Sequence, residues 1–229
     1  MTIELVMLDC DGVLIDSEII AAKVECERLN AWGFDIEPGA FSERFSGASE
    51  EDIGREVERE TGRSLPEGFH EATREAIYKR VSEEVAIIDG ADAMIRALDR
   101  PLCVCSNSGS AYLRTALERV GLWETLGEHV FSARDLGPDR QKPRPDVFLY
   151  AAEAMGVDPR RAVVLEDSAH GVEAGVAAGA RAIDFTGGAH SWRGHSDALT
   201  DAGATTVVSR HADVPATVAA LAGWDERTA

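Results

Sequence analysis

The sequence predicts an α/β fold, with a Rossmann-like, doubly wound and mostly parallel sheet as its core and an inserted all-helical cap domain. Short apolar segments alternate with helical patterns, which is typical of the βαβ units that build a parallel sheet. A charged stretch rich in Ala, Glu and Arg follows the first apolar segment and interrupts that alternation. We therefore expect a core domain of residues 1–16 and 87–229 and a helical cap domain of residues 17–86.

The expected strands are short apolar segments bounded by polar residues or turns. Ile3–Asp9 ends in a carboxylate, and Asp11-Gly12 then marks a turn. No convincing strand pattern occurs between Asp16 and Pro101. Further strands are expected at Leu102–Cys105, Ala162–Leu165, Arg181–Phe185 and, briefly, Val207-Val208.

The expected helices show apolar residues at helical spacing, and several begin near Pro or end at Gly. Gly33, Gly121 and Gly156 follow three of them directly. The helical patterns cover Ser17–Trp32, Glu50–Glu60, Pro66–Glu83, Ser110–Val120, Pro145–Met155 and Ser168–Ala178, the last with Val172 and Val176 on one face.

Composition and charge exclude several classes of protein. Lys and Arg number 23 and Asp and Glu number 41, which gives a net charge of −18 and argues against a nucleic-acid binder. No apolar stretch approaches the about 20 residues of a membrane span, and the N-terminus does not resemble a signal peptide. The four cysteines do not form a disulfide pattern, and Cys103 and Cys105 alternate on one face of a strand. We expect buried thiols in a cytoplasmic protein.

Polar residues follow the expected strands at the points where those strands end. Asp9 and Asp11 follow the first strand, Ser106-Asn107 the second, and Glu166-Asp167 the Ala162–Leu165 strand, while Lys142 stands between prolines. Ligands of open parallel sheets bind at the carboxyl ends of the strands. Each motif alone has an ordinary explanation as a turn, a helix cap or a surface lysine. Their order and spacing together favour one active site.

These motifs resemble those of the haloacid dehalogenase superfamily. Leu8–Glu18 resembles its first motif, Ser106–Ser108 the second, Lys142-Pro143 the third and Glu166–Ser168 the fourth, which Gly171–Ala180 continues. The resemblance covers about residues 3–186. Within the superfamily the chain resembles the β-phosphoglucomutase-like branch with a helical cap, and the 6-phosphogluconate phosphatase type of that branch.

The resemblance implies Mg²⁺-dependent phosphoryl transfer through an aspartyl phosphate. A divalent cation relieves the repulsion between an attacking carboxylate and a phosphate dianion. Asp9 would be both nucleophile and metal ligand, Asp167 a direct ligand, and Glu166 a direct or water-mediated one. Asp11 would offer its backbone carbonyl to the metal and its side chain as general acid and base.

The same resemblance assigns the remaining core residues. Lys142 would neutralise the clustered carboxylates, while the Ser106 hydroxyl and the Asn107 backbone amide would donate hydrogen bonds to the transferring oxygens. The expected reaction is hydrolysis of a small soluble phosphomonoester, of the sugar or sugar-acid phosphate class. The oligomeric state is not readable from the sequence.

Three alternatives compete with this interpretation. A dehalogenase needs no metal and no acid at Asp11, and a phospho-receiver module has no cap. A β-phosphoglucomutase resembles the core, but it carries a histidine near the position of Ala21 and a basic loop where Phe45–Glu50 has no basic residue. These departures favour hydrolysis over mutase activity.

The cap residues have weaker signals. Arg44 and Ser46, with Lys23, are candidates for contacting the leaving group, and the Arg44–Ser49 loop is expected to set substrate preference. His190 and His195 are expected to be surface residues, although they stand in a Gly-containing loop that can lie near the site.

Overall fold

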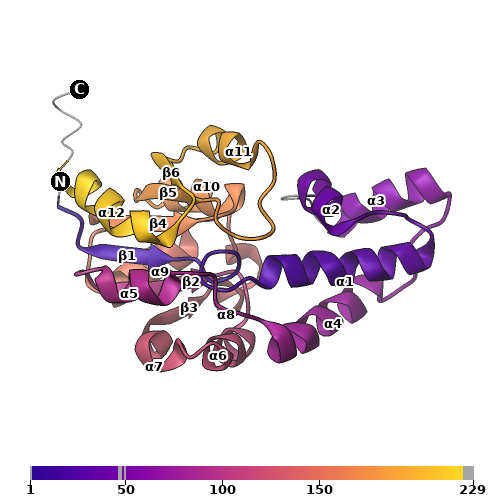
Figure 1. Ribbon diagram of the computed structural model, residues 1–229, viewed down its shortest axis with the longest axis horizontal. Helices are drawn as coiled ribbons and strands as arrows, with labels where there is room; N and C mark the ends of the chain where they lie inside the picture. Colours follow the sequence, from indigo (N-terminus) through magenta and orange to yellow (C-terminus); the bar gives the residue numbers. More distant parts are fainter. Residues whose placement is uncertain (1, 46–47, 49, 224–229) are drawn as a thin grey trace.

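A six-stranded parallel sheet forms the centre of the molecule in the computed structural model, which describes residues 2–45, 48 and 50–223 (Figure 1). The strand order is β3-β2-β1-β4-β5-β6, the order of a doubly wound fold. The chain adds β2 and β3 on one side of β1 and then adds β4, β5 and β6 on the other side. A crevice is therefore expected at the carboxyl ends of β1 and β4, where the strand order changes direction. The strands are β1 (Leu5–Leu8), β2 (Leu102–Ser106), β3 (Val130–Ser132), β4 (Ala162–Glu166), β5 (Arg181–Phe185) and β6 (Thr206–Val208).

The central strands are buried on both faces because helices cover the sheet on both sides. Val6 and Leu8 belong to one apolar cluster, whereas Leu5 and Met7 belong to another. This alternation follows from the two-residue period of a strand. Cys103 and Cys105 lie in the second cluster and are free and buried, as their spacing predicts.

The helices of the described chain connect the strands and build the segment after β1. The α-helices of the first half are α1 (Ser17–Trp32), α2 (Pro38–Phe45), α3 (Glu50–Thr61), α4 (Phe69–Glu84), α5 (Ala91–Ala97) and α6 (Ser110–Arg119). Those of the second half are α7 (Trp123–Leu126), α8 (Ala133–Leu136), α9 (Asp146–Ala154), α10 (Ala169–Ala177), α11 (His195–Asp201) and α12 (Val214–Gly223).

Helices α1 to α4 extend away from the carboxyl ends of the strands and pack mainly on one another (Figure 1). Their shared core is a separate apolar cluster that includes Leu29, Phe34 and Val57. The two chain segments that lead into and out of them are paired: the Asp16 amide donates to the Ala86 carbonyl, and the Ile88 amide to the Leu14 carbonyl, both at 3.0 Å. This pairing places both connections side by side.

The sequence did not predict several short elements. Strand β3 and helices α2, α5, α11 and α12 were not expected, because each is short or lacks a strong period. Val176, expected on the same face as the buried Val172, is 43% exposed, because α10 covers the sheet with a narrow stripe only. Among the described residues, no helix is long and apolar enough to cross a membrane.

Candidate active site

The first loop of the site follows β1 directly. The Asp9 amide donates to the Leu165 carbonyl at 2.9 Å, which fixes Asp9 beside β4 at the reversal point of the sheet. Gly12 has a φ of +74°, and a Cβ on it would lie 1.8 Å from Oδ2 of Asp167. Only glycine fits this turn, for conformational and steric reasons alike. The loop therefore brings the β1 and β4 motifs into contact.

Lys142 is the central cation of the site. Its Nζ donates to Asp9 Oδ1 and Glu166 Oε1, both at 2.5 Å, and to the Cys105 carbonyl at 2.6 Å. The side chain is 4% exposed. Burial alone lowers the pKa of Lys142, but the carboxylates of Asp9 and Glu166 outweigh it and raise that pKa above its ordinary value. Lys142 is therefore a permanent positive charge at this rim.

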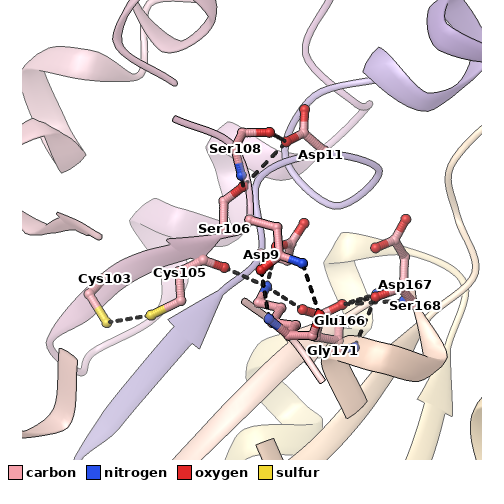
Figure 2. A network of polar contacts seen from close by, with 12 residues as sticks. Asp9, Asp11, Cys103, Cys105, Ser106, Ser108, Glu166, Asp167, Ser168 and Gly171 are labelled. Carbon is pink, nitrogen blue, oxygen red and sulfur yellow. Dashed lines mark hydrogen bonds and ion pairs between the residues drawn. The ribbon is translucent and has the colours of Figure 1, made fainter. Parts of the chain in front are cut away.

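Three buried carboxylates gather beside Lys142. One oxygen from each of Asp9, Glu166 and Asp167 lies within 4.8 Å of the other two (Figure 2). Burial raises the pKa of Asp9 strongly, and its acidic neighbours add to the effect while Lys142 opposes it. The pKa of Asp167 is raised for the same first reason and by Glu166. One lysine cannot compensate three carboxylates, so the set is suited to a divalent cation, for which oxygen ligands are preferred.

Glu166 and Ser168 show how the fourth motif is built. Ser168 accepts a hydrogen bond from the Gly171 amide at 3.1 Å and so caps α10. Glu166 Oε2 accepts from the Ser168 hydroxyl at 3.0 Å. A Cβ on Gly171 would meet the Glu166 carboxylate at about the length of a covalent bond, with the nearest atom at 1.9 Å. Ser168 thus caps a helix, while its neighbours Glu166 and Asp167 belong to the carboxylate cluster.

The Asp11 carboxylate is turned toward a group of hydroxyls. Its Oδ1 accepts from Ser17 at 2.6 Å and from Tyr112 at 2.8 Å. Its Oδ2 accepts from Ser108 at 2.8 Å and from Ser106 at 3.3 Å, as Figure 2 shows. Asp11 is consequently absent from the carboxylate cluster, which leaves only its backbone carbonyl for a metal. Nothing in the sequence motifs pointed to Tyr112, which follows Ser110 on α6.

Asn107 holds the Lys142 loop in place. Its Nδ2 donates to the Lys142 carbonyl at 3.2 Å, and its Oδ1 accepts from the Lys142 amide at 2.8 Å. Ser106 Oγ also accepts from the Ser108 amide at 3.0 Å. The second and third motifs are therefore joined by side-chain amide and hydroxyl bonds at the carboxyl end of β2.

Two histidines expected at the surface are instead buried against Asp167. His190 Nε2 lies 2.9 Å from Asp167 Oδ2, and His195 Nε2 lies 2.8 Å from the Asp167 carbonyl. The ring of Trp192 stacks on His195 at a centroid distance of 3.9 Å. This loop after β5 therefore closes one side of the site. The signal that could have indicated it is the pair of glycines at 187 and 188, which lets the loop pass close to Gly12.

A cavity of about 470 Å³ lies between the strand ends and the helices after β1. The core contributes the motif residues Asp9, Asp11, Ser106, Asn107, Lys142 and Asp167 to its wall. The helical segment contributes Ala21, Glu25, Phe41 and Phe45, among others. The six core residues named from the sequence are thus brought to one cavity, and Glu166 lies just behind Lys142.

Two of the candidate residues in the helical segment, Arg44 and Lys23, lie outside the cavity wall. The Arg44 guanidinium pairs with the carboxylates of Glu56 and Glu60 and does not line the cavity. Lys23 is exposed and is also not part of the wall. Ser46 lies outside the described residues.

Comparison with known proteins shows the family of the chain. Residues 3–179 match the family model described as haloacid dehalogenase-like hydrolase. A similar curated protein is the 6-phosphogluconate phosphatase of Escherichia coli K12, 30% identical over 190 residues, or 82% of this chain and 85% of that one. Fructose-1-phosphate phosphatase YqaB of the same organism is 28% identical, over 78% of this chain and 94% of its own.

Solved structures agree with the fold over nearly the whole chain. A conserved haloacid dehalogenase-like protein of unknown function from Agrobacterium tumefaciens C58 is 45% identical, with a TM-score of 0.93, over 96% of this chain and 99% of that one. A HAD family hydrolase from Deinococcus radiodurans R1, with bound phosphate and sodium, is 31% identical with a TM-score of 0.81, over 96% of both chains.

Proposed function

Because the chain belongs to the family of haloacid dehalogenase-like hydrolases, we propose that it is a Mg²⁺-dependent phosphatase acting through an aspartyl phosphate. Its substrate would be a small soluble phosphomonoester of the sugar or sugar-acid phosphate class. The observation that carries the proposal is the contact of Lys142 with both Asp9 and Glu166 beside Asp167. Relatives named as phosphatases support this class of hydrolase.

Asp9 is the proposed nucleophile because it stands at the end of β1, at the edge of the cavity, with one carboxylate oxygen held by Lys142. Its attack on phosphorus breaks the ester bond and forms an aspartyl phosphate, which water then hydrolyses. Lys142 offsets charge on the carboxylates and on the phosphoryl group. Ser106 and the Asn107 amide would donate hydrogen bonds to the phosphoryl oxygens.

Asp11 is the proposed general acid and base. It would protonate the leaving oxygen in the first step and take a proton from water in the second. To do so, its carboxylate has to leave hydroxyl partners such as Ser17 and Tyr112 and turn toward the cavity. We expect substrate binding to favour that turn, because the leaving oxygen offers Asp11 a new partner.

The proposed cofactor is Mg²⁺. Asp9, Glu166 and Asp167 would hold it with the Asp11 carbonyl, and their oxygen chemistry and burial fit that ion. When bound, it would supply positive charge that lets a carboxylate approach a phosphate.

We further propose that residues 17–86 form a cap domain on a core of residues 1–16 and 87–229. The paired connections at Asp16–Ala86 and Leu14–Ile88 support this boundary. Closure of the cap would exclude water while the leaving group is present. A small-molecule partner, without nucleic acid or membrane, and a cytoplasmic location stay predictions. Mutase activity is less supported, because Ala21 faces the cavity near where the mutase branch is expected to carry a histidine.

The test is phosphate release from p-nitrophenyl phosphate and a panel of metabolite phosphates, with Mg²⁺ and then with EDTA. We expect turnover that EDTA abolishes and that added Mg²⁺ restores. Turnover unchanged by EDTA would contradict the metal assignment, and conversion of one sugar phosphate to its isomer without phosphate release would favour the mutase.

A further inference from the structure

The far wall of the active-site cavity is formed by the helical segment and has a distinctive charge. Among the described residues that line the cavity, Lys142 is the only lysine or arginine, and it belongs to the core rim. The wall contributed by α1 to α4 instead includes the carboxyl groups of Glu18, Glu25 and Glu50. The part of a substrate that extends beyond its phosphoryl group therefore meets acids, and no lysine or arginine of α1 to α4 is among the described residues that line the cavity.

The arginines of the helical segment that lie nearest are engaged elsewhere. Arg74 pairs with Glu50 at 2.5 Å, and Arg28 donates to the Thr73 hydroxyl at 2.7 Å. Arg44 pairs with Glu56 and Glu60 on the outside of α3. None of the three lines the cavity. Arg74 compensates Glu50, whereas Glu18 and Glu25 form no ion pair among the described residues. Glu18 lies near Asp167 and His190 at the core side of the cavity, so Glu25 is the unpaired carboxyl beside the apolar side chains of the helical wall.

One carboxyl oxygen of Glu25 accepts no hydrogen bond from the part of the chain that the structure describes. This oxygen, Oε2, is fully buried. Burial raises the pKa of Glu25 to about 7; Glu50 adds to the shift, and the more distant charges of Arg28 and Arg74 oppose it. A buried oxygen without a partner costs free energy, and a small rotation of the Glu25 side chain toward the cavity would let a bound group that donates a hydrogen bond recover it. A hydroxyl can supply that bond, whereas a carboxylate or a second phosphate cannot.

The other residues of this wall are apolar. Phe41, Phe45, Ile53 and Ile77 line it beside Glu25. Carbohydrates and polyols present both C–H surfaces, which pack on such rings and side chains, and hydroxyls, which bond to carboxyl oxygens. An anionic leaving group would lose its hydration here without gaining a cation. The residues of this wall therefore favour a leaving group that carries no charge.

We propose that this cavity selects phosphomonoesters whose leaving group is an uncharged polyol or sugar and disfavours those with a second anionic group, and that Glu25 determines this selectivity. The inference rests on the proposed phosphatase function and narrows it, because it removes sugar-acid phosphates from the preferred class. It also separates this chain from what the name of its 6-phosphogluconate phosphatase relative says of that protein.

The test compares matched pairs that differ by one carboxylate. The kcat/KM of the full chain with Mg²⁺ is measured for glucose 6-phosphate against 6-phosphogluconate, and for glycerol 3-phosphate against 3-phosphoglycerate. We expect the uncharged member of each pair to be preferred by about tenfold, which corresponds to about 1.4 kcal/mol, because the acid member loses hydration at this wall without gaining a cation. Equal rates, or preference for the acids, would overturn the proposal.

Two substitutions locate the selectivity. Glu25→Gln should shrink the preference within each pair severalfold, and Glu25→Lys should shift it toward the acid member. Glu27→Gln is the matched control, because Glu27 lies on the same helix, is exposed and pairs with Arg80 outside the cavity. A folding defect would lower the kcat/KM of both members of a pair equally and leave their ratio unchanged. Unchanged ratios in both Glu25 variants would therefore overturn the assignment of Glu25.

The experiment also separates this inference from the function on which it rests. Absence of turnover of p-nitrophenyl phosphate and of every panel member would contradict the phosphatase function. Turnover with a preference for anionic leaving groups would contradict only the selectivity proposed for this wall.

Discussion

The imidazole of His190 lies against the carboxylate of Asp167, with Nε2 and Oδ2 2.9 Å apart and the two side chains only 8% and 7% exposed. Two glycines make room for this contact. A Cβ on Gly12 would be 2.9 Å from the His190 ring, and one on Gly188 would be 2.6 Å from it. The loop after β5 thus orients a carboxylate proposed to hold the metal, as hydrogen-bonding partners do for the carboxylate ligands of other metal sites.

His190→Ala is therefore expected to weaken metal binding about 10- to 100-fold, the usual effect of removing a partner that orients a ligand. The measurement is calorimetric titration of the substrate-free protein with Mn²⁺. His190→Gln, which keeps an N–H near the position of Nε2, should recover part of the affinity. His129→Ala is the control, because His129 is exposed on the short helix after α7. Equal affinities of wild type and His190→Ala would contradict the role.

The sequence indicated the core of the site but not its walls, for a physical reason. Asp9, Ser106 and Asp167 follow strands of one parallel sheet, and the ends of such strands meet at one rim whatever the details of packing. The position of His190 depends instead on the path of a loop, which no local pattern encodes. The position of the Arg44 side chain likewise depends on its ion pairs with Glu56 and Glu60. Those ion pairs form only when α2 packs beside α3.

The same distinction applies to the fold. The strands β1 and β4 consist almost wholly of apolar residues, β5 has apolar residues at Ala182, Ile183 and Phe185, and all three were predicted within one or two residues. Strand β3 has only three residues, Val130–Ser132, and is a strand because β2 offers a free edge beside it. A pairing partner distant in the sequence cannot be inferred from so short a segment.

Asp9→Asn should abolish turnover and leave no covalent phosphoenzyme, because an amide cannot act as the nucleophile. The measurement is intact-mass spectrometry after rapid quenching with substrate, alongside phosphate release. Circular dichroism should show that the variant is folded, since Asn retains the shape of Asp. Near-normal turnover of Asp9→Asn would contradict the covalent mechanism.

Asp11→Asn should lower kcat by about 10²- to 10⁴-fold, the usual contribution of a general acid and base. Metal affinity should stay near that of the wild type, because the Asp11 side chain bonds to Ser17, Ser108 and Tyr112 and lies outside the carboxylate cluster. Paired measurements of kcat and of Mn²⁺ affinity test both parts. A large loss of affinity would show that the carboxylate itself contributes to the metal site.

His195 should make the stability of the metal-free protein depend on pH. Burial lowers its pKa to about 4, whereas the unfolded value is about 6.5. The unfolded chain therefore binds a proton that the folded chain does not between these values. This contribution is fully present above about pH 6.5 and is lost as pH falls toward 4, by at most about 1.4 kcal/mol per pH unit.

Urea unfolding in the presence of EDTA at several pH values measures this effect. His195→Gln should show a smaller fall in the free energy of unfolding between pH 6.5 and 4.5 than the wild type. The comparison cancels the carboxylates that titrate in both proteins. Parallel curves for the two proteins would mean that folding does not lower the pKa of His195.

Arg44→Ala should leave the ranking of substrates unchanged. The guanidinium pairs with Glu56 and Glu60 and lies over the rings of Phe34 and Phe45 at 5.2 and 5.3 Å, so it stabilises the packing of α2 on α3 and does not reach the cavity wall. Its loss should cost about 1 kcal/mol of stability, as for other exposed ion pairs. The test is to measure kcat/KM of Arg44→Ala and of Glu25→Gln for the same matched pairs of substrates. If Arg44→Ala changed the preference between the uncharged and the acid member, the guanidinium would have to turn into the cavity when substrate binds. Glu25 would then not be the residue that alone determines the selectivity.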